Sequence, residues 1–207
     1  MDIKSYEEFC LYQNVSRETY DKLRVYEKTL IKWQASINLI SKSTINEIWV
    51  RHFLDSAQLH PIVNKIKGNI LDFGSGAGFP GLILAIMGNK NISLVESDYK
   101  KCTFLREVAM LCETNISIYN SRIENLEFKK VDLIISRALA PLYKLIQHVE
   151  NYIEKSPSNE KVWPKMLFLK GKSYRDEILE LKKYKNISFD EYPSLTNDQG
   201  KILYFSG

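Results

Sequence analysis

The stretch that decides the fold reads ILDFGSGAGFPG and spans residues 70–81. It begins with a short, mostly apolar run that is typical of a buried strand and ends at Phe73. Four glycines follow this run, at Gly74, Gly76, Gly78 and Gly81. Glycine lets the backbone turn sharply and approach a ligand closely, and Pro80 suits the first turn of a helix. A strand, a glycine-rich turn and a helix in this order are typical of α/β sheets that bind ligands at the carboxyl ends of their strands.

The rest of the chain after residue 69 alternates between short apolar runs and longer amphipathic stretches, which predicts parallel βαβ units. The predicted strands cover 70–73, 92–96, 116–120, 133–136 and 166–169, and the predicted helices cover 81–87, 100–113, 143–155 and 174–183. Two further runs, 187–189 and 202–205, are expected to close the sheet, with a turn at 196–200 between them. The polar stretch 156–164 contains two prolines and is expected to be a loop. The predicted fold class is therefore α/β, Rossmann-like, with a mostly parallel sheet.

The first sixty residues have a helical pattern. Apolar residues recur there at steps of three and four, at Leu23, Tyr26, Leu30, Trp33 and Ile37. No glycine occurs before Gly68, which favours helices over turns. We expect residues 1–60 to form a helical extension that packs on a domain formed by residues 61–207, within one globular unit.

The composition places few limits on function. The formal net charge is +4, which permits an RNA partner without requiring one. The three cysteines have no metal-ligand spacing, so we expect no metal site, and their odd number fits a reducing cytosol. The amino-terminal segment is polar and acidic, unlike a signal peptide, and the longest apolar run, around 81–88, is too short to span a bilayer. We expect a cytoplasmic protein with no membrane association.

The glycine spacing separates two kinds of nucleotide-binding loop. Dinucleotide oxidoreductases use G-x-G-x-x-G, whereas the first three glycines here run G-x-G-x-G and follow Asp72, a spacing typical of S-adenosylmethionine-dependent methyltransferases. Glu96 ends the second predicted strand and is placed to accept both hydroxyls of an unphosphorylated ribose. Such a ribose occurs in NAD and in S-adenosylmethionine, so Glu96 excludes only NADP. The sequence shows no proton relay for hydride transfer, because its three histidines are scattered, at His52, His60 and His148.

The segment after the fourth predicted strand narrows the choice of methyl acceptor. Exocyclic amino groups are often methylated by an Asn/Asp-Pro-Pro-aromatic loop at this place, where residues 136–141 read SRALAP. A pyrimidine C5 acceptor needs a nucleophilic cysteine, and none of the three cysteines lies in such a motif. Guanine N7 carries an in-plane lone pair and no proton, so it needs positioning but no general base. The absence of an evident base is consistent with this acceptor, and we assign no catalytic residue.

Several motifs together resemble one family, the bacterial GidB-type methyltransferases, which act on guanine N7 in the RNA of the small ribosomal subunit. The resemblance covers most of the chain in order. It rests on Asn38-Leu39, RHFLDS at 51–56, DFGSGAGFPG at 72–81, Glu96-Ser97, Lys100-Lys101, Phe104-Leu105-Arg106, SRIE at 121–124, SRA at 136–138 and LKG at 169–171. The arginine-histidine box combined with Ser-Arg-Ala is much more specific than the glycine loop alone.

The resemblance implies that the protein binds S-adenosylmethionine and acts on 16S ribosomal RNA. It implies a cofactor site formed by Gly74, Phe79, Ile123, Glu124 and Arg137. The glycine spacing adds Gly76 and Gly78 to this site, and the expected contact with the ribose adds Glu96. Ile123 departs from the alanine that is frequent in the family. The RNA-binding candidates are Arg51, His52, Lys100, Lys101, Arg122 and Lys170, of which Arg122 and Lys170, with Arg137, are expected to support methyl transfer by positioning.

Three questions stay open at this point. The box formed by Arg51, His52 and Asp55 is either a structural knot or a substrate contact. The acceptor is either the RNA or, alternatively, a small molecule or a protein. The protein itself is either a methyltransferase or, alternatively, a nucleotide-binding regulator without enzymatic activity. The sequence has no long apolar stripe or heptad pattern that forces a dimer, so we expect a monomer.

Overall fold

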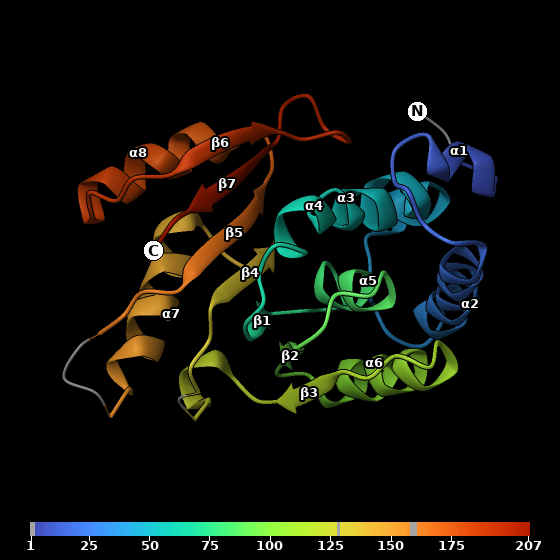
Figure 1. Ribbon diagram of the computed structural model, residues 1–207, viewed down its shortest axis with the longest axis horizontal. Coiled ribbons are helices and arrows are strands. Elements are labelled where there is room, and N and C mark those ends of the chain that lie inside the picture. The colour runs from blue at the N-terminus through green and yellow to red at the C-terminus, as the bar shows by residue number, and fades with distance from the viewer. Residues whose placement is uncertain (1–2, 128, 158–160) are drawn as a thin grey trace.

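Strand β1, Ile70–Phe73, lies near the centre of a sheet of seven strands with the order β3-β2-β1-β4-β5-β7-β6 (Figure 1). The computed structural model describes residues 3–127, 129–157 and 161–207. The other strands are β2 Ile92–Glu96, β3 Ser117–Asn120, β4 Leu133–Arg137, β5 Lys165–Lys170, β6 Asp190–Pro193 and β7 Lys201–Phe205. Strands β1 to β5 are parallel, and β7 runs antiparallel to both β5 and β6. The predicted α/β class with a mostly parallel sheet is confirmed.

Helices cover both faces of the sheet. They are α1 Tyr6–Cys10, α2 Arg17–Gln34, α3 Asp55–Ala57, α4 His60–Val63, α5 Gly81–Ile86, α6 Tyr99–Leu111, α7 Leu142–Glu154 and α8 Tyr174–Tyr184, with 3₁₀ turns η1 Lys42–Glu47 and η3 Ile123–Asn125 and a π-helical turn η2 Trp49–Leu54. Figure 1 shows α7 and α8 on one side of the sheet, and α2, α5 and α6 on the other. Within the described ranges, no helix is both long and apolar enough to cross a membrane.

Each face of the sheet has its own core because side chains alternate along a strand. In β1, Ile70 belongs to the cluster that includes α2, α5 and α6, whereas Leu71 and Phe73 belong to the cluster that includes α7 and α8. The central strands are buried on both sides, which explains why they read as continuous apolar runs in the sequence.

The amino-terminal helices share the first of these cores with the sheet. Leu23, Tyr26 and Leu30 of α2 are fully buried in it, and α2 contacts both α5 and α6. Helix α2 ends at Gln34, so the last residue of the predicted apolar stripe, Ile37, lies three residues beyond the helix. Helix α4, His60–Val63, runs across the boundary that we expected at residue 60.

One strand lies elsewhere than predicted. Residues 187–189 precede the edge strand β6 and are not part of it, so this prediction is wrong. Ile187 and Phe189 pack against the second core, which gave the run its apolar character, whereas all four residues of β6 are exposed. Pro193 is tolerated there because an edge strand leaves N–H groups unpaired. The predicted turn at 196–200 does join β6 to β7, and the described part of the 156–164 loop is irregular, while 158–160 lie outside the described residues.

Gly81 sets how closely α5 approaches the sheet. A methyl group added at this position meets Leu94 Cδ2 at 2.5 Å and Asp72 Oδ2 at 2.7 Å. Both neighbours are fully buried, so neither has free space to move into. We expect Gly81→Ala to lower the free energy of unfolding by about 1–3 kcal/mol, as overpacked core substitutions do.

Urea denaturation measures this effect. Gly171→Ala is the matched control, because a methyl group added at Gly171 meets no atom within 4 Å. Equal midpoints for the two variants would contradict the packing argument.

Candidate active site

The glycine-rich loop after β1 forms one wall of the site. Gly76 and Gly78 have φ angles of 57° and 93°, in the left-handed region that favours glycine. A Cβ at Gly78 would lie 2.4 Å from the hydroxyl oxygen of Tyr26 on α2. That hydroxyl donates a hydrogen bond to the carbonyl of Ala77, so the amino-terminal helix supports the loop from behind.

Glu96 joins the loop to the end of β2. Its carboxylate is buried and accepts the backbone N–H of Gly76 at 2.9 Å and that of Asp98 at 2.8 Å, one on each oxygen. A carboxylate oxygen has more than one acceptor site, so both oxygens can accept further hydrogen bonds. The carboxylate is therefore fixed in orientation and still able to receive hydroxyl donors.

Asp72 lies beneath the same loop. One oxygen accepts the N–H of Gly81 at 2.9 Å, and the other has no hydrogen-bond partner among the residues that the structure describes. The carboxyl is completely buried, and this burial raises its pKa to about 7, although the Gly81 N–H opposes the shift. Asp72 is thus a structural acid whose charge is costly at neutral pH.

A cavity of about 480 Å³, here called the first cavity, opens at the carboxyl ends of β1, β2 and β4. This volume is in the range of small-molecule sites. Seven of the eight predicted cofactor residues line it, namely Gly74, Gly76, Phe79, Glu96, Ile123, Glu124 and Arg137. Gly78 is part of the loop but does not line the cavity, and its nearest neighbours are Tyr26, Leu105 and Leu82. At the start of η3, the N–H groups of Ile123 and Glu124 have no hydrogen-bond partner within the described ranges, so they are available to a ligand.

A second cavity of about 530 Å³ adjoins the first. The two share four lining residues, His52, Arg137, Ala138 and Leu139. Ala138 has a φ of 53°, a conformation that costs energy for a residue other than glycine. These four shared residues, from η2 and from the end of β4 onward, form the partition between the cavities.

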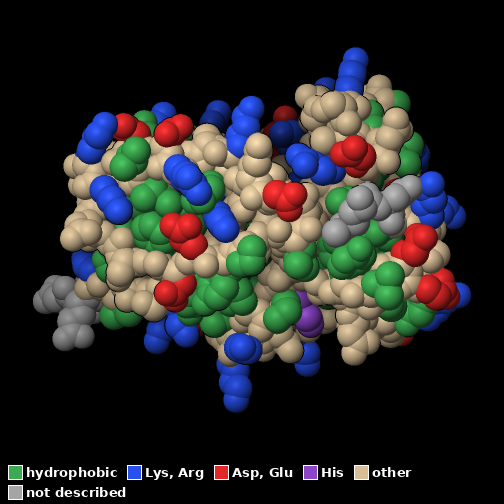
Figure 2. All heavy atoms as spheres, turned by 90° about the horizontal axis from the view of Figure 1, so that it is seen from above, with side chains coloured by type: hydrophobic (Ala, Val, Ile, Leu, Met, Phe, Trp, Pro, Cys, Tyr) green, Lys and Arg blue, Asp and Glu red, His purple; other side chains and the backbone are tan. Residues whose placement is uncertain are grey.

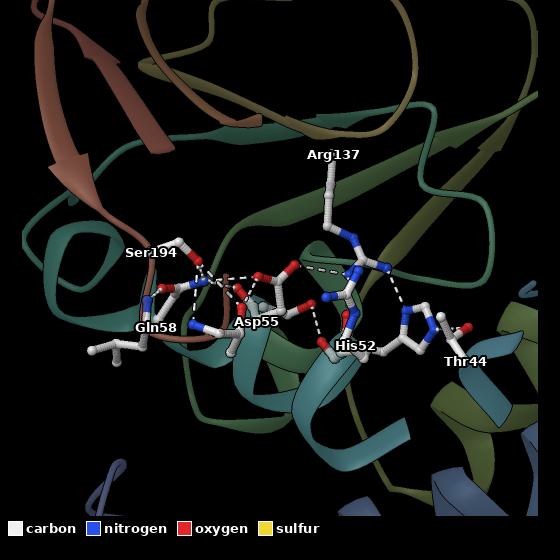
Figure 3. A network of polar contacts seen from close by, with 10 residues as sticks. Thr44, His52, Asp55, Gln58, Arg137 and Ser194 are labelled. Carbon is white, nitrogen blue, oxygen red and sulfur yellow. Dashed lines mark hydrogen bonds and ion pairs between the residues drawn. The ribbon is translucent and has the colours of Figure 1, made fainter. Parts of the chain in front are cut away.

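Arg137 is held in this partition by three acceptors (Figure 3). Its Nη1 donates to Asp55 Oδ2 at 2.9 Å and to the carbonyl of Arg51 at 2.8 Å, and its Nη2 donates to His52 Nδ1 at 2.8 Å. Its guanidinium also lies 4.9 Å from the centroid of the Phe79 ring. The π-helical turn η2 presents Arg51 and His52, and π turns are frequent at functional sites.

His52 is neutral in this arrangement. Burial lowers its pKa to about 3, and the positive charges of Arg137 and Arg51 add to the effect. Arginine is only a donor, so His52 Nδ1 accepts and its proton resides on Nε2. Nε2 then donates to the Thr44 hydroxyl at 2.9 Å, which in turn donates to the carbonyl of Ser41. Both ring nitrogens are engaged, so His52 orients its neighbours and is not free to act as a base.

The predicted basic residues occupy different positions. Arg51 is exposed and lines the second cavity, while Arg122 and Lys101 line the first. Lys100 is exposed at the start of α6 and lines neither cavity. Lys170 lines the second cavity but is buried, with its Nζ 2.6 Å from Glu177 Oε2 and 2.8 Å from the carbonyl of Ala140.

Sequence reasoning missed the uncharged residues that complete the network. Thr44, Gln58, Ser194 and Thr196 contact His52, Asp55 or one another. No motif or spacing marked them, because Ser, Thr and Gln are common on exposed turns. Only the meeting of segments that lie far apart in the chain gives them a role.

The fold is the Rossmann-like fold that S-adenosylmethionine-dependent methyltransferases share, and the first cavity lies where such a sheet binds its ligand. Among solved structures, the chain is similar to a magnesium protoporphyrin IX methyltransferase from Synechocystis with bound S-adenosylmethionine, with a TM-score of 0.60, 12% identity, and 92% and 97% of the two chains covered. A ribosomal protein L11 methylase from Lactobacillus delbrueckii gives a TM-score of 0.55 at 17% identity over 74% of this chain and 78% of that one. At these identities the likeness concerns the fold.

Sequence relatives identify the family. The model of the GidB family, described as rRNA small subunit methyltransferase G, matches residues 19–200. A ribosomal RNA small subunit methyltransferase G from Paramagnetospirillum magneticum is 43% identical over 96% of this chain and 93% of its own length. One from Orientia tsutsugamushi is 41% identical over 92% and 91%. The chain therefore belongs to the GidB family, as the resemblance of its motifs implied.

The buried carboxyl of Asp72 makes the stability of the protein depend on pH. The unfolded chain loses this proton near pH 3.8 and the folded chain near pH 7, so folded Asp72 retains its proton to higher pH and stability falls as pH rises towards 7. Asp72→Asn removes the titration. We expect the difference in unfolding free energy between the variant and the wild type to shift in favour of the variant by about 2–3 kcal/mol as pH rises from 5 to 8.

Urea titrations at the two pH values test this. Asp98→Asn is the control, because the N–H groups of Lys101 and Lys100 lower the pKa of Asp98 and its titration is complete below pH 5. A constant difference between Asp72→Asn and the wild type across this range would show that Asp72 does not titrate as described.

Proposed function

We propose that this protein transfers the methyl group of S-adenosylmethionine to N7 of one guanine in the 16S RNA of the small ribosomal subunit. The names of its relatives support the RNA acceptor. The observation that carries the choice of N7 is that, among the residues that the structure describes, the partition between the two cavities offers positioning groups but no free base. Arg137 is a permanent cation, and both nitrogens of His52 are occupied.

In this proposal the first cavity holds S-adenosylmethionine. Glu96 accepts the ribose hydroxyls while its bonds to Gly76 and Asp98 keep the carboxylate oriented. The free N–H groups of Ile123 and Glu124 hydrogen-bond the adenine edge, and the glycine loop permits close approach of the backbone. A contact through the backbone does not depend on the side chain at position 123. When bound, S-adenosylmethionine supplies an electrophilic methyl group on a sulfonium.

The second cavity then receives the guanine. Enzymes that act on a base take it out of its stack or use an unpaired one. Arg137, Ala138 and Leu139 line both cavities, so they lie where donor and acceptor meet. The role of this chain is to orient the N7 lone pair towards the methyl group and to exclude water, because this acceptor gives up no proton.

Basic side chains around the cavities contact the RNA in this proposal. Arg51, Lys101 and Arg122 border the cavities, and Lys100 extends the same charged region at the start of α6. On the face in Figure 2, Lys and Arg side chains are interspersed with Asp, Glu and apolar groups rather than forming one basic field. Lys170 supports the second cavity without contacting the RNA. Its ion pair with Glu177 fixes the end of β5 relative to the start of α7, because Glu177 also accepts the N–H of Leu142.

We further infer that the protein works in the cytoplasm, where its proposed substrate occurs, and as a monomer. The sequence has no long apolar stripe or heptad pattern that forces a dimer, which supports the second point. Residues 1–60 and 61–207 act as one unit in this proposal, because the box that includes Arg51 and Asp55 and the sheet that carries Arg137 form the same partition.

The direct test is transfer of labelled methyl to small subunits purified from a strain that lacks this enzyme. We expect label in 16S RNA and chain cleavage at one site after chemistry selective for N7-methylguanine. Label in a protein or small molecule alone would contradict the proposed acceptor. Binding of S-adenosylmethionine without transfer to any subunit preparation would instead indicate a regulator.

The role of Glu96 is tested by Glu96→Gln. The amide carries one donor group that must face a backbone N–H or a ribose hydroxyl, and it has no charge. We expect the affinity for S-adenosylhomocysteine in calorimetry to fall about 10- to 100-fold, as for the loss of a charge-assisted hydrogen bond. Glu191→Gln on the exposed strand β6 is the control, and equal affinities for the two variants would remove Glu96 from the ribose site.

A further inference from the structure

The turn between β6 and β7 reaches into the second cavity from the far end of the chain. Ser194 and Thr196 line this cavity together with Arg51 and Asp55. Thr196 and Asp55 are 141 positions apart in the sequence, yet the Thr196 hydroxyl donates a short hydrogen bond to Asp55 Oδ1. The turn was expected only to connect two strands, so this contact gives it a second role.

Asp55 stands between this turn and Arg137 (Figure 3). Its Oδ2 accepts from Arg137 Nη1 at 2.9 Å, and its Oδ1 accepts from Thr196 and from Gln58 Nε2 at 2.9 Å. The ion pair is largely buried, with exposed side-chain fractions of 15% for Arg137 and 17% for Asp55. In such surroundings a carboxylate is held by its hydrogen bonds, so each donor on Oδ1 helps to set the direction of Oδ2.

Gln58 fastens the turn to the same place. Its side-chain oxygen accepts the N–H of Leu195 at 2.8 Å while its nitrogen donates to Asp55. Because Thr196 spends its single hydroxyl proton on Asp55, the Ser194 hydroxyl is the donor in its 3.2 Å contact with Thr196. The donors and acceptors of this network therefore form one consistent set.

The geometry points to Thr196 as a positioning residue for methyl transfer. Thr196 lines the acceptor cavity, its hydroxyl fixes Asp55, and Asp55 fixes the guanidinium of Arg137, which also lines the donor cavity. The assignment of the two cavities rests on the function proposed above. A change at the turn thus reaches the donor cavity through two side-chain contacts.

Two substitutions isolate the hydroxyl. Thr196→Val keeps the shape and removes the donor, and Thr196→Ser restores it. We expect Thr196→Val to weaken S-adenosylhomocysteine binding in calorimetry about 3- to 10-fold, which is less than the full strength of its charge-assisted hydrogen bond because Thr196 acts through Asp55 and Arg137. We expect Thr196→Ser to stay within about twofold of the wild type. In methyl transfer to small subunits, we expect kcat to fall while the KM for the RNA changes little.

A double-mutant cycle with Arg137→Lys separates positioning from a structural role of the turn. Lysine lacks the planar fork, so the orientation set by Asp55 is lost in this background. We expect Thr196→Val to have less than about a twofold further effect there, because residues that act through one another are not additive. An equal effect of Thr196→Val in both backgrounds, or none in either, would overturn the proposal.

Urea midpoints of all variants show whether folding is intact. If Thr196→Val is destabilised, Thr196→Ala repeats the cycle without a buried methyl group at the hydroxyl's place. The binding cycle uses S-adenosylhomocysteine alone, so it tests Thr196 whatever the acceptor is. Failure of the proposed function appears separately, as a wild-type protein that leaves the small-subunit RNA unlabelled.

Discussion

The ion pair between Arg137 and Asp55 is the interaction on which the arrangement of the site depends. It joins the end of β4 to the helical segment before β1, and through Asp55 it reaches the turn before β7. The removal of one partner from a buried pair leaves an uncompensated charge, which typically costs about 3–5 kcal/mol. The pair is therefore a strong constraint on the relative position of three segments, and the boundary of both cavities follows from it.

The sheet brings the other parts of the site to this boundary. Parallel strands place their carboxyl ends at one edge, so the glycine loop after β1, Glu96 at the end of β2 and Arg137 at the end of β4 become neighbours. Helix α2 completes the arrangement from the opposite side, since Tyr26 holds the loop at Ala77. The amino-terminal helices thus contribute to both cavities through their support of Phe79 and His52, whose rings stack with centroids 5.0 Å apart.

The central fold was predictable because its signals are local. Each parallel strand is a short apolar run, and the glycine spacing and Glu96 lie within 27 residues of one another, from Ile70 to Glu96. The edge strand was misplaced because its own four residues are all exposed, while the apolar residues next to it, Ile187 and Phe189, pack against the core. A run of apolar residues indicates which residues are buried. It does not indicate an edge strand, because an edge strand is defined by its backbone pairing.

The uncharged residues of the site, such as Thr196, could not be predicted from the sequence for a different reason. The box at Arg51 to Asp55 was recognisable, but the sequence did not show that Arg137 donates to Arg51, His52 and Asp55 together. The contribution of Thr196 depends on tertiary contact across most of the chain. The box positions Arg137, and its residues also line the second cavity, so their contact with a substrate stays a prediction.

The most direct test of this account is hydrogen exchange measured with and without S-adenosylhomocysteine. We expect slower exchange of the backbone amides in the glycine loop at 74–79, at 121–124 and at the end of β4, because these segments line one cavity. Unchanged exchange in all three segments, or protection confined to 169–171 and 194–197, would contradict the assignment of the first cavity to the methyl donor.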